Sequence, residues 1–319
     1  MRFVYSPRSV QTGAYVSFLA AICLMLLAGL WAWGRFYREV DDENAEVRRV
    51  AKNSAVLMFL SLLNRGIDFA FAMLRLRILG PIGEGSYAFV ISIYGFFEIV
   101  VRYGLGTLLT RDVAQEKDQA GRYLTNVLGL RLIIYALSIP AVVLVAGLYA
   151  AGGDLSTAEA QTLALFMVSL FFATLSDSFS AVFIAYEEME YPAGISTAIV
   201  VAKVALGGLV LLPPFNAGFV GLAAVSLAMN IVQSVWLWTS MRKRIPLRLG
   251  GLDRALQRTM AVQAFPLMLN HLLSNIFWRI DLWLLKALAS TASVGIYSAG
   301  VKYLDGFNVI PSYFTIALF

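Results

Sequence analysis

Cysteine, histidine and charge are all scarce in this chain. Its 319 residues include one cysteine, Cys23, and one histidine, His271. A single thiol cannot close a disulfide within the chain, and these two residues cannot supply a Cys/His metal site. Charged residues make up 14% of the sequence, whereas soluble proteins carry about 25%. The composition excludes a disulfide scaffold and a Cys/His metal centre, and it is not that of a soluble protein.

Apolar sequence takes the place of the missing charge. Hydrophobic residues make up 59% of the chain, and runs near the ~20 residues that a helix needs to cross a bilayer recur along its length. Because the backbone must satisfy its own hydrogen bonds in lipid, long runs without alternation predict helices rather than a barrel. We therefore predict an all-α fold, a polytopic transmembrane helical bundle. Its nine predicted spans are 13–34, 53–79, 86–109, 123–150, 161–185, 193–214, 217–241, 263–288 and 293–318.

The basic residues gather in alternate connections between the spans. The formal net charge is +5, which by itself is compatible with nucleic-acid binding. However, Lys and Arg concentrate in segments 35–52, 110–122 and 242–262, and the connections 80–85, 151–160, 215–216 and 289–292 contain none. This is how a membrane protein fixes its orientation, with basic loops in the cytoplasm. We expect a multi-pass membrane protein with no nucleic-acid partner.

A short internal repeat suggests two related bundles. "LGPIGEGSY" at 79–87 and "ASTASVGIY" at 289–297 align Gly85 with Gly295 and Tyr87 with Tyr297, with six helices between one start and the next. Repeated bundles with a site between them are typical of transporters. The predicted domains are an extra N-terminal transmembrane helix with a cytoplasmic linker (1–50), a first six-helix bundle (51–244), a cytoplasmic amphipathic linker (245–262), and the first two helices of a second bundle that we expect to be incomplete (263–319).

Charged residues also lie inside the apolar runs. A charge at mid-membrane costs about 2.5–3.5 kcal/mol even on the mildest scale, so such residues face a protein interior or water. One interpretation is structural ion pairing, for example between Arg65 and Asp68 at i,i+3. The other is a polar cavity lined by cations from several helices. Arg75 and Arg77 lie near the outer end of their span, where a long side chain can extend to the interface.

Three segments carry a resemblance to a known family. "NSAVLMFLSLLNRGIDFAFAMLRLRILGPIGEGSYAFV", "YGLGTLLTRDVAQEK" and "PLMLNHLLSNIFWRIDLWLL" resemble the polysaccharide and O-antigen flippases of the multidrug/oligosaccharidyl-lipid/polysaccharide exporter superfamily, over about residues 50–319. The resemblance implies two six-helix bundles around a cavity that faces the two sides of the membrane in turn. It also implies a lipid-pyrophosphate-linked oligosaccharide as cargo, carried outward across a bacterial or archaeal cytoplasmic membrane.

This cargo suggests roles for the charges within the spans. A pyrophosphate needs cations along its path, and the arginine fork offers paired donors to phosphate oxygens. We predict no catalytic residue, cofactor or metal. A proton or another cation is the candidate coupling ion, and membrane lipids and other membrane proteins of polysaccharide assembly are candidate partners. The predicted substrate-binding residues are Arg65, Arg102, Arg131, Lys203 and Arg279, and the predicted coupling or positioning acids are Asp68 and Asp281.

Two other function classes fit parts of the pattern. A multidrug or cation exporter of the same superfamily would require a cavity dominated by acids, whereas the charges here are as much cationic as acidic. A membrane glycosyltransferase or polymerase that uses a lipid-linked sugar would require a catalytic set on a sizeable outer loop. The predicted outer loops are short, and the longest carries only Asp154 and Glu159 as acids. The sequence favours transport.

Overall fold

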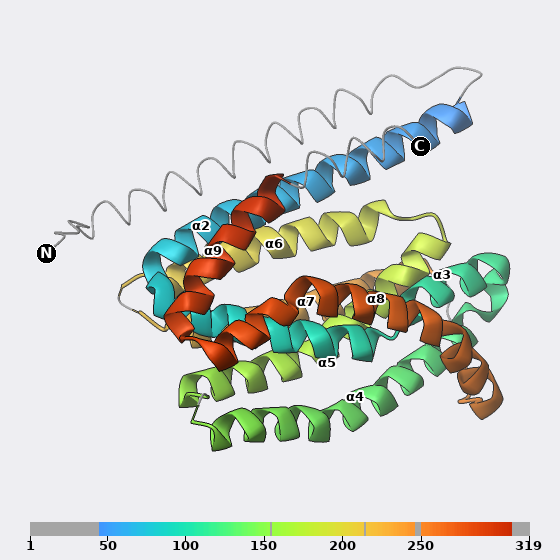
Figure 1. The fold of residues 1–319 in the computed structure, drawn as a ribbon. Helices are drawn as coiled ribbons and strands as arrows, with labels where there is room; N and C mark the ends of the chain where they lie inside the picture. The colour runs from blue at the N-terminus through green and yellow to red at the C-terminus, as the bar shows by residue number, and fades with distance from the viewer. Residues whose placement is uncertain (1–44, 154, 214, 246–249, 308–319) are drawn as a thin grey trace, which may run out of the picture.

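The computed structural model describes residues 45–153, 155–213, 215–245 and 250–307, and every regular element in this part of the chain is a helix (Figure 1). The predicted span 13–34 and the end of the predicted span 293–318 lie outside the described residues. The elements are α2 (Ala45–Arg102), α3 (Leu105–Gln115), the short 3₁₀ helix η1 (Lys117–Gln119), α4 (Ala120–Ala151), α5 (Thr157–Ala185), α6 (Glu190–Leu211), α7 (Gly218–Arg244), α8 (Arg254–Leu288) and α9 (Thr291–Phe307).

The expected membrane architecture is confirmed at the level of helices, but the number of spans is not. Within the described residues, five helical segments are long and apolar enough to cross a membrane. Helices α8 and α9 are not among the five. Helix α8 interrupts its apolar sequence with charges such as Arg279, Asp281 and Lys286, which lowers its hydropathy. The five segments are Leu63–Gln115, Lys117–Ala151, Thr157–Ala185, Glu190–Leu211 and Gly218–Arg244.

Helix α2 covers the predicted span 53–79 and most of the predicted span 86–109, and it is broken between them. Gly80 has φ 65° and ψ −178°, a conformation that is open essentially to glycine alone, and Pro81 follows with no N–H to donate. Arg75 and Glu84 join the two sides of the break through a double contact of 2.8 and 2.6 Å. The Arg75 guanidinium also lies 4.2 Å from the ring centre of Tyr87. The expected extension of Arg75 to the interface is therefore wrong, because Glu84 supplies a buried partner within reach.

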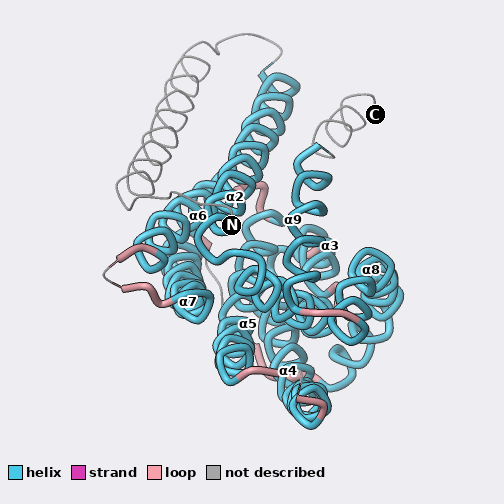
Figure 2. The backbone as a smooth tube through the Cα atoms, turned by 60° about the vertical axis from the view of Figure 1, so that its left-hand side comes forward, coloured by secondary structure: helices cyan, strands magenta, loops and turns pink. Residues whose placement is uncertain are grey.

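The helices pack around two large apolar clusters and a small third one, formed by Leu63, Ile67 and Val204, which joins α2 to α6. In Figure 2, α6 and α7 lie on one side of the molecule and α8 and α9 on the other. One large cluster, with Leu105, Leu124 and Phe183 at its centre, lies where α3, α4 and α5 meet the start of α8. The other large cluster, which includes Phe89 and Leu170, lies toward the opposite end of the bundle. Apolar packing thus fixes how α2, α5, α6 and α7 face one another.

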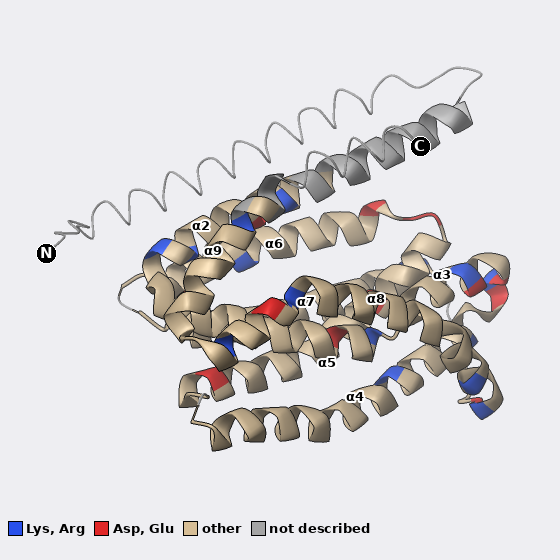
Figure 3. Cartoon of the chain, viewed as in Figure 1, with Lys and Arg blue, Asp and Glu red and all other residues tan. Residues whose placement is uncertain are grey.

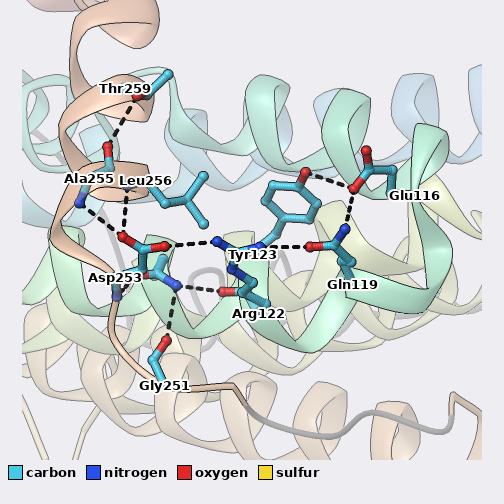
Figure 4. Close-up of polar contacts among 10 residues, drawn as sticks. Glu116, Gln119, Arg122, Tyr123, Gly251, Asp253, Ala255, Leu256 and Thr259 are labelled. Atoms are coloured by element: carbon cyan, nitrogen blue, oxygen red, sulfur yellow. Dashed lines mark hydrogen bonds and ion pairs between the residues drawn. The ribbon is translucent and has the colours of Figure 1, made fainter.

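The segment before α8 is attached to the beginning of α4 (Figure 4). Asp253 caps α8 by accepting hydrogen bonds from the backbone N–H groups of Ala255 and Leu256, and its other oxygen accepts from Arg122 at 2.8 Å. The Asn126 amide accepts from the Asp253 N–H at 2.7 Å and donates to the Gly251 carbonyl at 3.2 Å. The hydrogen bond from Arg122, together with those from the helix N-terminus, lowers the pKa of the Asp253 carboxyl below its usual value.

At the opposite end of the bundle, the break in α2 packs directly against the start of α9. A Cβ atom on Gly85 would overlap the Thr291 carbonyl, and a Cβ atom on Gly295 would overlap the Pro81 carbonyl. The contact is reciprocal, and the same spacing along the chain separates Pro81 from Thr291 and Gly85 from Gly295. We call this the glycine contact. Only residues without a side chain allow the two backbones to come so close.

A buried ion pair lies at the same end as the glycine contact. Lys286 of α8 contacts Glu159 of α5 at 3.1 Å and donates to the Thr291 hydroxyl at 2.8 Å. Both charged side chains are at most 5% exposed. Glu159 also completes the N-terminal cap of α5, where it accepts a hydrogen bond from the Ser156 N–H. Helix α8 is thereby attached to the first turn of α5.

Candidate functional site

A polar cavity of about 310 Å³ lies between α2, α5, α6 and α7. Charged residues lie around α3 and the start of α8 and also along α2, and few appear along α4 to α7 (Figure 3). A polar cavity inside helices of this composition is therefore a local exception. Nine of its twelve lining residues are polar: Glu98, Arg102, Ser176, Asp177, Ser180, Ser196, Lys203, Asn230 and Gln233.

A chain of alternating charges runs along one wall of the cavity. Arg102 contacts Glu98, one turn earlier on α2, at 2.8 Å, and Asp177 of α5 at 2.9 Å. The second oxygen of Asp177 contacts Arg131 of α4 at 2.5 Å. Arg131 is buried and is not one of the residues that line the cavity. The four charges balance, so this chain is electrically neutral overall.

Lys203 of α6 supplies a cation that is not paired with a carboxylate. Its ammonium group donates to the side-chain oxygen of Asn230 at 2.9 Å, and the Asn230 amide donates to Ser169 at 2.7 Å. Among the described residues, no carboxylate forms an ion pair with it. A cation held by a neutral amide in a low-dielectric region attracts an anion strongly. Asp68 and Glu98 lie within electrostatic reach of Lys203 without contacting it. In the described part of the chain Lys203, unlike Arg102, is therefore a lining cation with no carboxylate in direct contact.

The structure brings together some of the residues that the sequence predicts for the site. Arg102 and Lys203 line the cavity, and Arg131 lies behind its wall. Asp68 on α2 is not a lining residue, but it lies within electrostatic reach of Lys203. Arg65 is exposed on the same helix and does not line the cavity either.

The two predicted site residues of α8 lie apart from the cavity. Neither Arg279 nor Asp281 lines it, and both are half-buried. Asp281 accepts a hydrogen bond from the Tyr297 hydroxyl of α9. Substrate binding by Arg279 and coupling by Asp281 stay predictions.

Several lining residues were missing from the predicted site. Asn230, Gln233 and the serines are ordinary polar residues within apolar helices, and no single one of them stands out in the sequence. The signal that was present is "SDSFS", where Ser176, Asp177 and Ser180 fall on one helical face at i, i+1 and i+4. Hydroxyl and amide groups carry no charge, so the charge pattern of the sequence does not indicate them.

The "YGLGT" stretch shapes the region next to the charge chain. Tyr103 and Gly104 have φ of 52° and 71° and separate α2 from α3. Gly106 follows in α3, where a Cβ atom would lie 2.9 Å from the Asp177 carboxylate and 3.5 Å from the Arg131 guanidinium. The backbone of α3 therefore lies directly over the pair formed by Arg131 and Asp177.

Comparison with known proteins identifies the family. Residues 50–319 match a family model described as polysaccharide biosynthesis protein. The chain belongs to this family. It is the family of the polysaccharide and O-antigen flippases, which the resemblance had indicated. The comparison with curated proteins and the comparison with solved structures gave no match.

Membership of the polysaccharide biosynthesis family and the long apolar helices agree in describing a polysaccharide-related membrane protein. In the described part of the chain, no group of three or more His, Cys, Asp or Glu residues is placed to hold a metal ion. The chemistry that the cavity offers is hydrogen bonding and charge, from hydroxyls, amides and cations.

Proposed function

We propose that this protein is a flippase that moves a lipid-linked oligosaccharide across the cell membrane for polysaccharide synthesis. The observation that carries the proposal is the polar cavity with Lys203 inside it. An anionic head group, such as a pyrophosphate, loses its hydration when it enters a membrane, and a cation without a carboxylate partner offsets that loss. The hydroxyl and amide groups around Lys203 are the partners that sugar hydroxyls require.

The position of the cavity agrees with this role. Its lining includes Arg102, Ser180 and Ser196, which lie near the ends of α2 and α5 and the start of α6, the end where the basic connections lie. The positive-inside rule assigns that end to the cytoplasm. The glycine contact closes α2 against α9 at the other end. We propose that this arrangement receives cargo from the cytoplasmic side, and that the glycine contact separates when cargo leaves outward.

The test measures translocation by the purified chain in vesicles. A fluorescent oligosaccharide on an isoprenyl pyrophosphate is placed in the membrane, and its transfer is followed by its protection from a reagent that cannot cross. We expect transfer to exceed that in protein-free vesicles. Lys203→Ala should slow it about tenfold or more, because the loss of one charge-assisted hydrogen bond is worth about that factor. Lys203→Arg keeps the charge and should retain most of the rate.

Lys243→Ala is the matched control, because Lys243 is an exposed lysine at the end of α7 and does not line the cavity. It should leave transfer unchanged. If wild-type vesicles transfer no faster than empty ones, the flippase proposal is wrong. If Lys203→Ala transfers at the wild-type rate with equal folded protein, the cavity is not the path. Transfer of a cationic dye in place of the sugar lipid would favour an exporter of cations.

A further inference from the structure

Arg131 is a predicted substrate ligand, yet its position is that of a supporting residue. Its side chain is 3% exposed and does not line the cavity. One terminal nitrogen donates to the Thr174 carbonyl at 2.5 Å and to the Ser178 hydroxyl at 2.7 Å, and the other contacts Asp177. Both terminal nitrogens are therefore occupied by α5.

A contribution to the stability of the fold does not explain why an arginine is buried at position 131. A buried ion pair is often no more stable than apolar side chains of the same volume. The Arg131 Nε is, in addition, buried without a hydrogen-bond partner, which is an unfavourable arrangement for any donor. An apolar residue at this position would avoid both costs. The placement of Arg131 therefore indicates a role that depends on its charge and geometry.

Asp177 transmits that geometry to the cavity. One of its oxygens contacts Arg131 and the other contacts Arg102, so each oxygen serves a different arginine. The second terminal nitrogen of Arg102 contacts Glu98. Two carboxylates thus hold the Arg102 guanidinium, and its side chain remains 40% exposed. A guanidinium held in one orientation loses less conformational entropy when it binds a phosphate than a free one does.

Gly106 closes the other side of the pair. A Cβ atom there would press against the carboxylate of Asp177 at 2.9 Å. Asp177 is therefore confined between Arg131 and the backbone of α3. Because the φ of Gly106 is not in the left-handed region, alanine fits the helix itself and would disturb only the pair.

We infer that Arg131 is a positioning residue: it fixes Asp177, which together with Glu98 presents the Arg102 guanidinium to a phosphate-bearing head group in the cavity. The inference rests on the proposed function, because it requires such a head group to enter. It assigns Arg131 to the support of the site rather than to contact with the cargo.

A double-mutant cycle tests this with a defined probe. The purified full chain in detergent is titrated with farnesyl pyrophosphate by calorimetry, for wild type, Arg102→Gln, Arg131→Gln and the double variant. If Arg131 acts through Arg102, each single change should weaken binding about fivefold or more, and the double change should cost little beyond Arg102→Gln alone. Arg131→Lys should recover part of the affinity, because one donor can still reach Asp177.

A second pair of variants keeps the test valid if Arg131→Gln fails to fold. Gly106→Ala removes no charge and should weaken binding by displacing Asp177. Gly147→Ala is its control, since a Cβ atom on Gly147 of α4 meets nothing within 4 Å. That variant should bind like the wild type.

The outcomes separate the two proposals. The positioning role would be overturned if the losses of affinity from Arg102→Gln and Arg131→Gln were additive. It would also be overturned if the Arg131→Gln or the Gly106→Ala protein bound the probe like the wild type. If the wild type does not bind farnesyl pyrophosphate, or if Lys203→Ala binds it equally well, the anion site of the proposed function is wrong. If the wild type does not bind farnesyl pyrophosphate, the positioning role of Arg131 is wrong as well.

Discussion

The two ends of the helix bundle contain the same kinds of side chain but arrange them differently. At the end of the basic connections, Glu98, Arg102 and Asp177 surround an open cavity of about 310 Å³. At the other end, Lys286 and Glu159 are buried beside the glycine contact. An ion pair beside space can exchange a partner for a ligand, whereas an ion pair without space can only hold helices together. The packing around the charges, rather than the type of charge, therefore decides whether they can bind a ligand or only hold helices together.

The largest expected difference between the two ends is in stability. Lys286→Ala leaves the buried Glu159 without its cation, which should destabilise the protein by about 3–5 kcal/mol. Lys203→Ala removes a cation whose partner is the neutral Asn230, and should cost about 1 kcal/mol or less. Thermal unfolding of the two variants in the same detergent measures the contrast. Adding Glu159→Gln to Lys286→Ala should restore part of the loss, because no buried charge remains unpaired.

Equal losses for Lys286→Ala and Lys203→Ala would remove the contrast in stability between the two ends. A Lys286→Ala protein as stable as the wild type would show that water reaches Glu159.

A smaller loss of stability is expected when a glycine of the glycine contact is replaced by alanine. Gly85→Ala places a methyl group against the Thr291 carbonyl, and such overpacking costs about 1–3 kcal/mol. Gly295→Ala should cost a similar amount, and the two losses should not add, since either one separates the same backbones. The unfolding midpoint measures this. Gly300→Ala on α9 is the control, because its Cβ atom meets nothing within 4 Å; a loss there equal to that of Gly85→Ala would contradict the interpretation.

The smallest effect is expected at Asp253, where the attachment of α8 to α4 depends on pH. Because the hydrogen bond from Arg122 lowers the carboxyl pKa in the folded state, its contribution is complete above the unfolded pKa and is lost as the pH falls through the folded pKa. The unfolding midpoint of the wild type should therefore drop more on acidification than that of Asp253→Asn. Parallel curves for the two proteins would exclude a contribution from this carboxylate.

The helices were predictable because hydropathy is local. The predicted spans 123–150 and 161–185 fall within α4 and α5, and 217–241 nearly coincides with α7. The predicted span 263–288 also falls within α8, although α8 is not among the segments that are long and apolar enough to cross a membrane. The break of α2 at Gly80 agrees with the predicted boundary between the spans 53–79 and 86–109, since a glycine followed by proline usually ends a helix.

The candidate site was only partly predictable because its contacts join distant segments. The pair of Glu98 and Arg102 follows from i,i+4 spacing and is present. The contact of Arg131 with Asp177 and that of Lys286 with Glu159 join helices far apart in the sequence. Hydropathy finds such charges but not their partners. Five cations were predicted for one cavity from their charge. The rotation of each helix about its axis, which the charge pattern does not give, decides which side chains face the cavity, and only Arg102 and Lys203 of the five line it.

The side-chain amide of Asn126 has a mechanical consequence. By donating to Gly251 and accepting from Asp253, it imitates the paired hydrogen bonds that one strand makes to its neighbour, although it belongs to a helix. If the first turn of α8 tilts, either these two hydrogen bonds break or the start of α4 moves with it. The start of α4 and the start of α8 are thus coupled, so that a displacement of one helix displaces the other.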